Sequence, residues 1–333
     1  MKISSPLTAM PLWKPFSVLK DSEAAMKILE CVPNFSEGRA PKKVREIAAA
    51  AEAVSGVSLL DYSWDTDHHR SVVTFLGAPE DVYEAALAAG GKALEIIDLR
   101  GHDGVHPRIG AVDVVPFIPL AETQMAEAVY WAHRFGRTFA ERHGVPVFFY
   151  GEAAVNPARR QLPDIRRGGL AGLIDRLCNR GWYPDAGPSA CPERAGAVAV
   201  GARMPLIAYN INLKTADIAL AKRIAGRIRE ANGGLPGVRA IGVFLASRKL
   251  AQVSMNLTDF RVTSLQDAFD FVSREAAAAG MEVLESELIG LAPQAALNAE
   301  TAAAILLRDF SPARIIETHL RNVEEPRAGA DPP

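Results

Sequence analysis

Apolar positions recur along the chain in two periods, one typical of buried strands and one typical of amphipathic helices. Short apolar, often β-branched runs bounded by turn residues predict strands. They lie at 28–32, 58–62, 71–76, 111–118, 145–150, 197–203, 206–212, 238–246, 251–257 and 282–291. Apolar residues spaced by one helical turn predict helices. These lie at 41–56, 79–98, 123–143, 170–177, 215–231, 264–279 and 293–307.

The order of these elements repeats weakly between the two halves of the chain. Strand, helix, strand, strand and helix over 28–98 match the same series over 206–279, and a strand follows each series. Each half is therefore β-α-β-β-α-β, the ferredoxin-like order. The predicted fold class is α+β, with two ferredoxin-like subdomains in one chain. We expect an active-site cleft between them, because small molecules commonly bind where two such units meet.

Composition suggests where the subdomains begin and end. Residues 1–25 contain scattered prolines and no continuous apolar stretch, which predicts a loose extension and neither a signal peptide nor a membrane span. The linker-like stretch Gly-Trp-Tyr-Pro at 181–184 divides an N-terminal subdomain, 26–180, from a C-terminal one, 181–310. Residues 311–333 are predicted to be a tail with a disordered end.

Composition and charge narrow the classes of function. An apolar fraction of 49% with only 7% aromatic residues is ordinary for a soluble α/β protein. The formal net charge is −2 and Lys and Arg are dispersed, so nucleic acid is not an expected partner, and neither is a membrane. The three cysteines lack metal-type spacing, which indicates reduced thiols in the cytoplasm.

Ionisable residues gather in a loop at 100–110, directly before a buried strand. Glycines and a proline prevent a regular helix, so His102 and His106 do not share a helical face. Histidine can both accept and return a proton near neutral pH. In the alternative interpretation, these histidines cap backbone groups and Arg108 is solvated, but the combination favours a functional loop.

Carboxylates occur at two further strand ends. The connection at 63–70 contains Asp65, Asp67, two histidines and Arg70, and Glu152 directly follows the strand at 145–150. Each could orient a substrate, yet such residues are also common in hairpins and surface turns.

Four histidines and an aspartate have the composition of a metal site. They are His68, His69, His102, His106 and Asp67. A metal-dependent hydrolase is therefore the competing enzyme hypothesis, although no pair of these residues lies on a predicted helix.

A series of short motifs between 28 and 307 occurs in the order and spacing of a known family. They are CVPNFSEG at 31–38, RSVVTF at 70–75, HPRIGAVDVVPFIP at 106–119, YGEAA at 150–154, GPS at 187–189, GAR at 201–203, NINL at 210–213 and LAQVS at 250–254. On these residues the chain resembles the glutamate formimidoyltransferase family, including the transferase domain of formimidoyltransferase-cyclodeaminase.

The resemblance implies an activity and its partners. The family transfers a formimino group from N-formimino-L-glutamate to tetrahydrofolate, giving 5-formiminotetrahydrofolate and L-glutamate, in histidine degradation. Tetrahydrofolate would be a co-substrate, and no metal is expected. The resemblance also implies a cytoplasmic homodimer. The chain ends without the cyclodeaminase domain of the bifunctional members, so that activity is not implied and a separate cyclodeaminase is a possible partner.

The resemblance also implies site residues. His106, in the His-Pro-Arg motif, would be the catalytic general base and acid. The folate-binding segment corresponds to Gly187, Pro188, Ser189, Ala190, Cys191, Pro192, Glu193, Arg194, Ala195 and Gly196. Contacts to the substrates are expected from Asn34, Asp65, Asp67, His69, Arg70, Arg108, Glu152, Asn210, Asn212 and Gln252. Carboxylates would orient the amidine, and the guanidinium groups would bind glutamate carboxylates as bidentate pairs.

The chain departs from the family pattern at 191–194, where the family is more apolar, and at His69, where asparagine is expected. Two further hypotheses remain open. Formyl transfer between 5-formyltetrahydrofolate and glutamate would use nearly the same site, since formyl and formimino groups differ only in O versus NH. A non-catalytic folate-binding or assembly protein would keep the loops for their shape alone.

Overall fold

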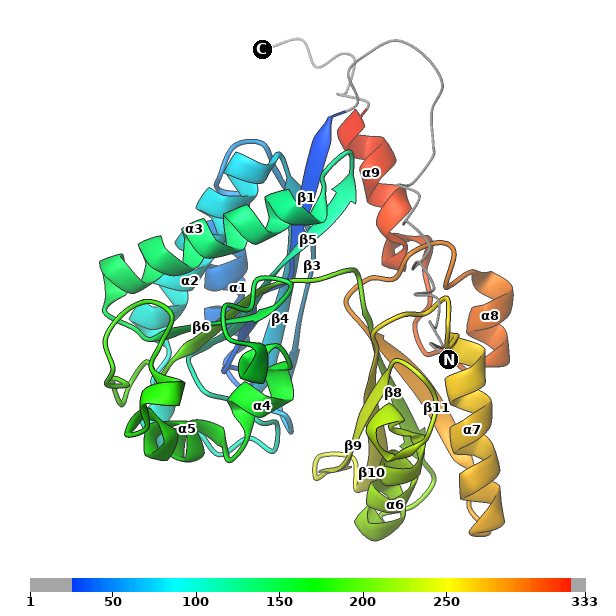
Figure 1. Ribbon diagram of the computed structural model, residues 1–333. Helices are drawn as coiled ribbons and strands as arrows, with labels where there is room; N and C mark the ends of the chain where they lie inside the picture. The colour runs from blue at the N-terminus through cyan, green and yellow to red at the C-terminus, as the bar shows by residue number, and fades with distance from the viewer. Residues whose placement is uncertain (1–25, 325–333) are drawn as a thin grey trace, which may run out of the picture.

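The computed structural model describes residues 26–324 as two α/β units that lie side by side (Figure 1). The extension predicted at 1–25 and the last part of the predicted tail, 325–333, lie outside the described residues. The mixed α/β class with two sheets confirms the broad fold prediction. No helix within the described range is long and apolar enough to cross a membrane.

The N-terminal unit is built on a seven-stranded sheet. Its strands are β1 (Lys27–Cys31), β2 (Asn34–Phe35), β3 (Val57–Asp65), β4 (Arg70–Gly77), β5 (Val112–Ala121), β6 (Val147–Gly151) and β7 (Val198–Ala202). β3, β4, β1 and β5 pair in that order and antiparallel, and β2 pairs with β4 and β5 beyond the end of β1. β7 and β6 extend the sheet parallel to β5.

Three helices cover one face of this sheet (Figure 1). They are α1 (Pro41–Glu52), α2 (Pro79–Ile96) and α3 (Met125–His143). Proline opens α1 and α2, where its missing N–H costs nothing, and Gly144 in the left-handed conformation ends α3. The short helices α4 (Leu162–Arg166), which was not predicted, and α5 (Gly169–Leu177) pack on the opposite face near β6.

The C-terminal unit is a four-stranded antiparallel sheet with the order β11-β8-β10-β9. Its elements are β8 (Ile207–Leu213), α6 (Ile218–Ile228), β9 (Val238–Leu245), β10 (Leu250–Leu257), α7 (Leu265–Ala278) and β11 (Val283–Ile289). Ile207, Tyr209 and Ile211 alternate along β8 and join the core with α6 and α7. The residues between them turn to the other, helix-free face.

Three features differ from the sequence expectation. β7 belongs to the first sheet, so the chain changes sheets between 202 and 207, after the predicted boundary at 180/181. The helix expected at 293–307 is only α8 (Ala299–Ala304), because the Asn298 side chain accepts the Thr301 N–H and starts the helix there. The segment predicted as a tail contains α9 (Ile316–Glu324).

The helix α9 connects the C-terminal segment to the first sheet. Ile316 and Leu320 are buried in one cluster with Leu76 of β4 and Ile118 of β5. These strand residues lie on the face that α1, α2 and α3 leave uncovered. Burial of apolar side chains against this face explains why the segment is helical and packed.

Candidate active site

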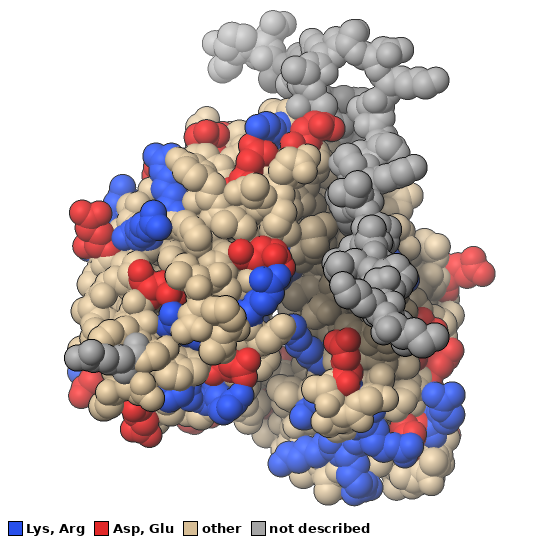
Figure 2. Space-filling view, in the orientation of Figure 1, with Lys and Arg blue, Asp and Glu red and all other residues tan. Residues whose placement is uncertain are grey.

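The face of the first sheet opposite α1, α2 and α3 and the helix-free face of the second sheet line a cavity of about 370 Å³. In the space-filling view the molecule is hollowed between the two units (Figure 2). Val72 of β4 and Val114 and Pro116 of β5 supply an apolar floor on one side, and Ala208 of β8 faces them from the other unit. Ionisable side chains stand around this floor.

His106 lies at one end of the cavity, in the loop before β5. Its Nδ1 is 2.8 Å from the Pro107 carbonyl oxygen, so Nδ1–H donates there and Nε2 is left to accept. A guanidinium N–H of Arg70 donates a hydrogen bond to this Nε2. Burial, and then the charges of Arg70 and Arg166, hold the pKa of His106 well below its usual range. His106 is therefore neutral, and its Nε2 faces the guanidinium of Arg70.

Backbone contacts fix the shape of this loop. Arg108 donates to the carbonyl oxygens of Gly104, at 2.8 Å, and His106, at 3.3 Å. The Gly110 backbone packs on β7 so closely that a Cβ would lie 1.9 Å from the Ala197 carbonyl oxygen, which only glycine allows. Arg108, predicted to bind substrate, supports the loop through these contacts and is not among the residues that line the cavity.

Two other histidines also hold the loop in place. The His102 ring stacks on His69 with ring centroids 4.0 Å apart, and its Nε2 is 2.8 Å from the His69 carbonyl oxygen. The Gly38 N–H donates to Nδ1 of His69 at 3.1 Å. Burial lowers the pKa of His102 to about 4, so this ring is neutral. His69, a predicted substrate contact, lies outside the cavity lining.

Arg70 and Arg166 form a cationic pair beside His106. Arg166 is ion-paired with Asp113, whose other oxygen accepts the Ile109 N–H at 2.8 Å. Arg70 makes no ion pair with a carboxylate of residues 26–324, and its Nε is buried without a hydrogen bond there. Burial, followed by the Arg166 charge, lowers the pKa of Arg70 to about 9. An unpaired buried guanidinium of this kind fits an incoming anion.

Asp65 and His68 also line the cavity, near His106. Nδ1 of His68 is 2.9 Å from Asp65 Oδ1, and the His68 backbone N–H donates to the same oxygen at 2.7 Å. Burial raises the pKa of Asp65, but hydrogen bonds from His68 outweigh it and lower the pKa overall. The His68 and His106 rings are 6.1 Å apart. Asn34 also lines the cavity, where its amide donates to the Val32 carbonyl oxygen at 2.8 Å.

Glu30 of β1, which was not among the predicted site residues, lies further along the cavity and is only 4% exposed. Burial raises the pKa of Glu30 to about 7, and the charge of Arg203 acts in the opposite direction. Tyr150 lines the same part of the cavity, and burial raises the pKa of its phenol too. This end therefore combines a carboxyl group that is easily protonated with a guanidinium.

Replacing Glu30 with glutamine should stabilise the protein at alkaline pH. The folded carboxyl has a pKa of about 7 against a usual 4.5, so folding retains a proton between these values and wild-type stability falls as pH rises through that window. We expect the variant to gain about 3 kcal/mol at pH 8 and less than about 1 kcal/mol at pH 5. Urea unfolding at both pH values measures this. An equal effect at both would contradict the prediction.

The helix-free face of the second sheet carries a network of amides and carboxylates. Gln252 donates to Asn212 Oδ1 at 2.9 Å and to Glu287 Oε1 at 2.7 Å, and Asn212 donates to Glu285 Oε1 at 3.0 Å. Asn212 and Gln252 are fully buried, so these predicted substrate contacts hold the carboxylates and do not line the cavity. Asn210 does line it, and donates to Glu287 at 3.4 Å.

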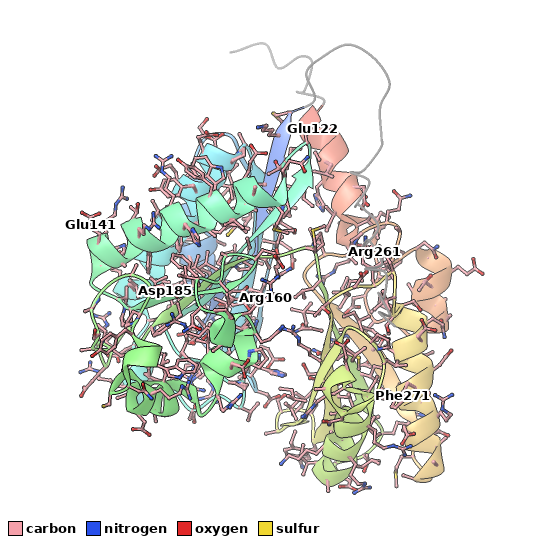
Figure 3. All side chains as sticks on the ribbon, in the orientation of Figure 1. Glu122, Glu141, Arg160, Asp185, Arg261 and Phe271 are labelled. Carbon is pink, nitrogen blue, oxygen red and sulfur yellow. The ribbon has the colours of Figure 1, made fainter. Side chains whose placement is uncertain are left out.

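Two predicted carboxylate contacts have protein partners outside the cavity lining. Glu152 is ion-paired with Arg160, which is labelled in Figure 3. Asp67, in the β3–β4 hairpin, accepts from the backbone N–H and the hydroxyl of Ser247, at 3.1 and 2.6 Å. Since Ser247 lies in the β9–β10 hairpin, this contact joins the two units.

Replacing Asp67 with alanine is expected to cost about 1 kcal/mol of unfolding free energy, the usual value of such hydrogen bonds. Because Asp67 lies outside the cavity lining, ligand binding in the cavity should change little in this variant. Chemical denaturation of D67A, S247A and the double variant measures the shared contact. Additive losses would show that the two residues act independently.

None of the ten residues from Gly187 to Gly196 lines the cavity. The segment is largely exposed and packs beside the base of the His106 loop. Arg194 donates to the Ile97 carbonyl oxygen at 3.3 Å, and Gly196 forms a bridge with Gly110.

No group of three or more His, Cys, Asp or Glu side chains within 26–324 is arranged to hold a metal ion. Of the five residues of the competing metal-site hypothesis, His68 and His106 line the cavity, and Asp67, His69 and His102 do not.

The predicted site omitted most of the ionisable side chains that line the cavity. They are Glu30, His68, Tyr150, Arg166, Arg203, Glu287, Arg308, Asp309 and Arg314. A charged residue in the middle of the apolar run at 28–32 was the available signal for Glu30. Arg166 gave no such signal, because it stands among several arginines of one polar segment.

Comparison with known proteins assigns the family. The formiminotransferase domain, N-terminal subdomain, matches residues 28–203, and the formiminotransferase domain matches 208–313. The glutamate formimidoyltransferases of Streptococcus pyogenes serotype M1 and Thermoplasma acidophilum are 41% and 42% identical, each over 88% of this chain and 99% and 97% of their own lengths. The formimidoyltransferase-cyclodeaminase of Sus scrofa is 42% identical over 88% of this chain and 56% of that protein. The chain belongs to the formiminotransferase family.

Proposed function

We propose that this protein transfers the formimino group of N-formimino-L-glutamate to tetrahydrofolate, giving 5-formiminotetrahydrofolate and L-glutamate, as a step of histidine degradation. The similarity to glutamate formimidoyltransferases along nearly their whole length supports this reaction. The observation that carries it is a neutral histidine with a directed Nε2, beside an unpaired arginine, in a cavity lined by both units.

We infer that each unit is a ferredoxin-like subdomain and that the substrates bind in the cleft between them. The strand orders β3-β4-β1-β5 and β9-β10-β8-β11 support the first inference, since both place the first and third strands of a βαββαβ series at the centre. The cavity lined by residues of both sheets supports the second. We also propose that the protein is a cytoplasmic homodimer whose product passes to a separate cyclodeaminase.

The carboxylates of formiminoglutamate bind Arg70 and Arg166 in this proposal. Both guanidinium groups line the cavity, and a carboxylate would occupy the N–H groups of Arg70 as a bidentate pair. The protonated amidine is a cation, and Asp65, held ionised by His68, is the carboxylate that faces it. The remaining predicted contacts that line the cavity, Asn34 and Asn210, bind polar groups of the two substrates.

His106 moves the proton in this mechanism. N5 of tetrahydrofolate attacks the amidine carbon, and Nε2 of His106 takes the proton that N5 loses. The resulting imidazolium returns this proton to the glutamate nitrogen, so that the C–N bond to glutamate breaks and the formimino group stays on N5. One neutral histidine is sufficient for both transfers, since the proton taken from the nucleophile is the one given to the leaving group.

Substrate binding would prepare His106 for this step. In the free protein Nε2 accepts from Arg70, and burial together with neighbouring cations depresses its pKa. A carboxylate bound to Arg70 removes that hydrogen bond and offsets the positive field, so it raises the basicity of Nε2. The base is therefore activated only when the formimino donor is in place.

We retain the segment 187–196 as a proposed contact for the p-aminobenzoyl-glutamate part of tetrahydrofolate. Its exposure and its bridge to Gly110, at the base of the His106 loop, support a position near the cavity opening.

Formimino transfer itself is the test of this function. Purified protein is mixed with tetrahydrofolate and N-formimino-L-glutamate, and the product is detected as methenyltetrahydrofolate after acid treatment. We expect product only when both substrates and enzyme are present. Binding of folate without formation of this product would refute the assignment, and product from a formyl donor in its place would identify the activity as formyl transfer.

A further inference from the structure

The proposed mechanism leaves one buried carboxyl group of the cavity without a role. Glu30 lies on β1, between β4 and β5, and is 4% exposed. Its side chain lines the cavity, yet no residue within 26–324 donates a hydrogen bond to it or forms an ion pair with it. Burying a carboxyl group without partners is costly, so a protein that keeps one at a binding surface has a use for its two acceptor atoms.

The surroundings of Glu30 combine apolar residues with a few polar groups, which are Thr74 of β4, Tyr150 of β6 and Arg203. Ile118 is its neighbour on β5, and Val32 and Pro116 continue the floor. Arg203 is the charged group that acts on Glu30. The Arg203 backbone N–H donates to Phe117, and its Nη1 donates to the Met204 carbonyl oxygen at 3.0 Å. The carboxyl group of Glu30 thus offers hydrogen-bond acceptors, and the guanidinium of Arg203 offers donors, beside the apolar surface of Val32 and Pro116.

The distance from Arg70 indicates which substrate reaches Glu30. Glu30 pairs with Leu76 of β4, which is six residues beyond Arg70. About 20 Å along the strand direction therefore separate Glu30 from Arg70. Formiminoglutamate held at Arg70 carries its amidine only part of this way. A row with formiminoglutamate at Arg70 and a pterin ring beyond it spans this distance. The ring edge furthest from His106 then meets Glu30.

We propose that Glu30 and Arg203 bind the 2-amino-4-oxopyrimidine edge of the tetrahydropterin ring. This inference rests on the proposed function. The carboxylate of Glu30 accepts from N3–H and from the 2-amino group, and the guanidinium of Arg203 donates to the 4-oxo oxygen. The floor of Val32 and Pro116 covers the flat ring, and N5, on the opposite side of the ring, is directed toward the amidine and His106.

The acid–base behaviour of Glu30 supports this pairing. Burial raises the pKa of Glu30 to about 7 in the free protein. Two N–H donors favour the ionised carboxyl, so binding of the ring releases a proton wherever Glu30 is still protonated. Affinity for tetrahydrofolate should therefore rise with pH up to about 7 and level off above it. The Glu30→Gln variant should lack this dependence.

The test compares two ligands that differ only at the 2-amino group, tetrahydrofolate and 2-desaminotetrahydrofolate. Their affinities are measured by calorimetry under reducing, oxygen-free conditions. We expect the wild type to prefer tetrahydrofolate by about 10- to 100-fold, the range of hydrogen bonds to a charged group. The Glu30→Gln variant should lose most of this preference, because its amide places an N–H against the donors of the ring.

Glu287→Gln is the matched control. Its carboxylate also lines the cavity but is already bonded to Gln252 and Arg308, so the preference between the two ligands should stay at the wild-type value. A full preference in Glu30→Gln overturns the inference. So does a selective rise in the KM for formiminoglutamate, which would assign Glu30 to the amidine. Failure of the proposed function is a separate result, because wild-type protein would then form no methenyltetrahydrofolate.

Discussion

Replacing His106 with alanine is expected to lower kcat for formimino transfer about 10²- to 10⁴-fold, the usual contribution of a general acid–base group. The affinity for tetrahydrofolate should remain nearly unchanged, because the ring edge and tail are bound by other residues in the proposal. Steady-state rates and calorimetric titration of the same preparation measure the two effects. Within residues 26–324 the His106 side chain forms hydrogen bonds only with Pro107 and Arg70, so the fold should tolerate the change.

The pH dependence distinguishes a proton-transfer role from a structural one. Wild-type kcat/KM should rise with pH as His106 loses its proton. Because burial and neighbouring cations lower its pKa, this limb should lie below the usual histidine pKa of about 6.5. The limb should vanish in His106→Ala and remain in His143→Ala, which changes an exposed histidine at the end of α3. An unchanged kcat in His106→Ala would remove His106 from the mechanism.

Replacing Arg70 with methionine is expected to raise the KM for formiminoglutamate by about 100-fold or more, because a bidentate pair contributes two charge-assisted hydrogen bonds. Lysine should restore little of this loss, since an ammonium group is a single point charge without the planar fork. The KM for tetrahydrofolate should change much less. Initial rates with each substrate varied in turn measure the difference.

Stability shows whether Arg70 is kept for binding or for the fold. Arg70 has no carboxylate partner among residues 26–324, and burial lowers its pKa to about 9. Removing an uncompensated buried charge should leave the free energy of unfolding unchanged or raise it. Arg160→Met, which breaks only the exposed pair with Glu152, should leave both KM values at the wild-type level. A large loss of stability in Arg70→Met with normal KM would identify Arg70 as structural.

Local sequence patterns were sufficient for most helices and strands. Alternating apolar residues indicate one buried face of a strand, and this information is contained in a few consecutive residues. The alternating pattern correctly predicted β8, and Pro79 correctly predicted the start of α2. It failed for α9, which is stabilised by Leu76 and Ile118 and so depends on contacts far along the chain.

The loop with His106 was also evident from sequence, because its ionisable residues and its glycines are neighbours in the chain. The roles of the nearby groups were not. Asp67 and Glu152 look like substrate contacts in the sequence, but each has a protein partner, Ser247 or Arg160, that no local pattern reveals. Such pairs depend on how distant hairpins and turns meet.

By itself, the sequence determined that the fold mixes helices and strands, the order of most of these elements, the family resemblance and His106 as the candidate base. Only the tertiary structure decided which charged groups share the cavity. Glu30 and Arg203 are separated by most of the N-terminal unit in sequence and come together because β1 and β7 both pair with β5. The physical reason is that burial and electrostatic fields are set by neighbours in space, whereas hydrophobic periodicity is set by neighbours in the chain.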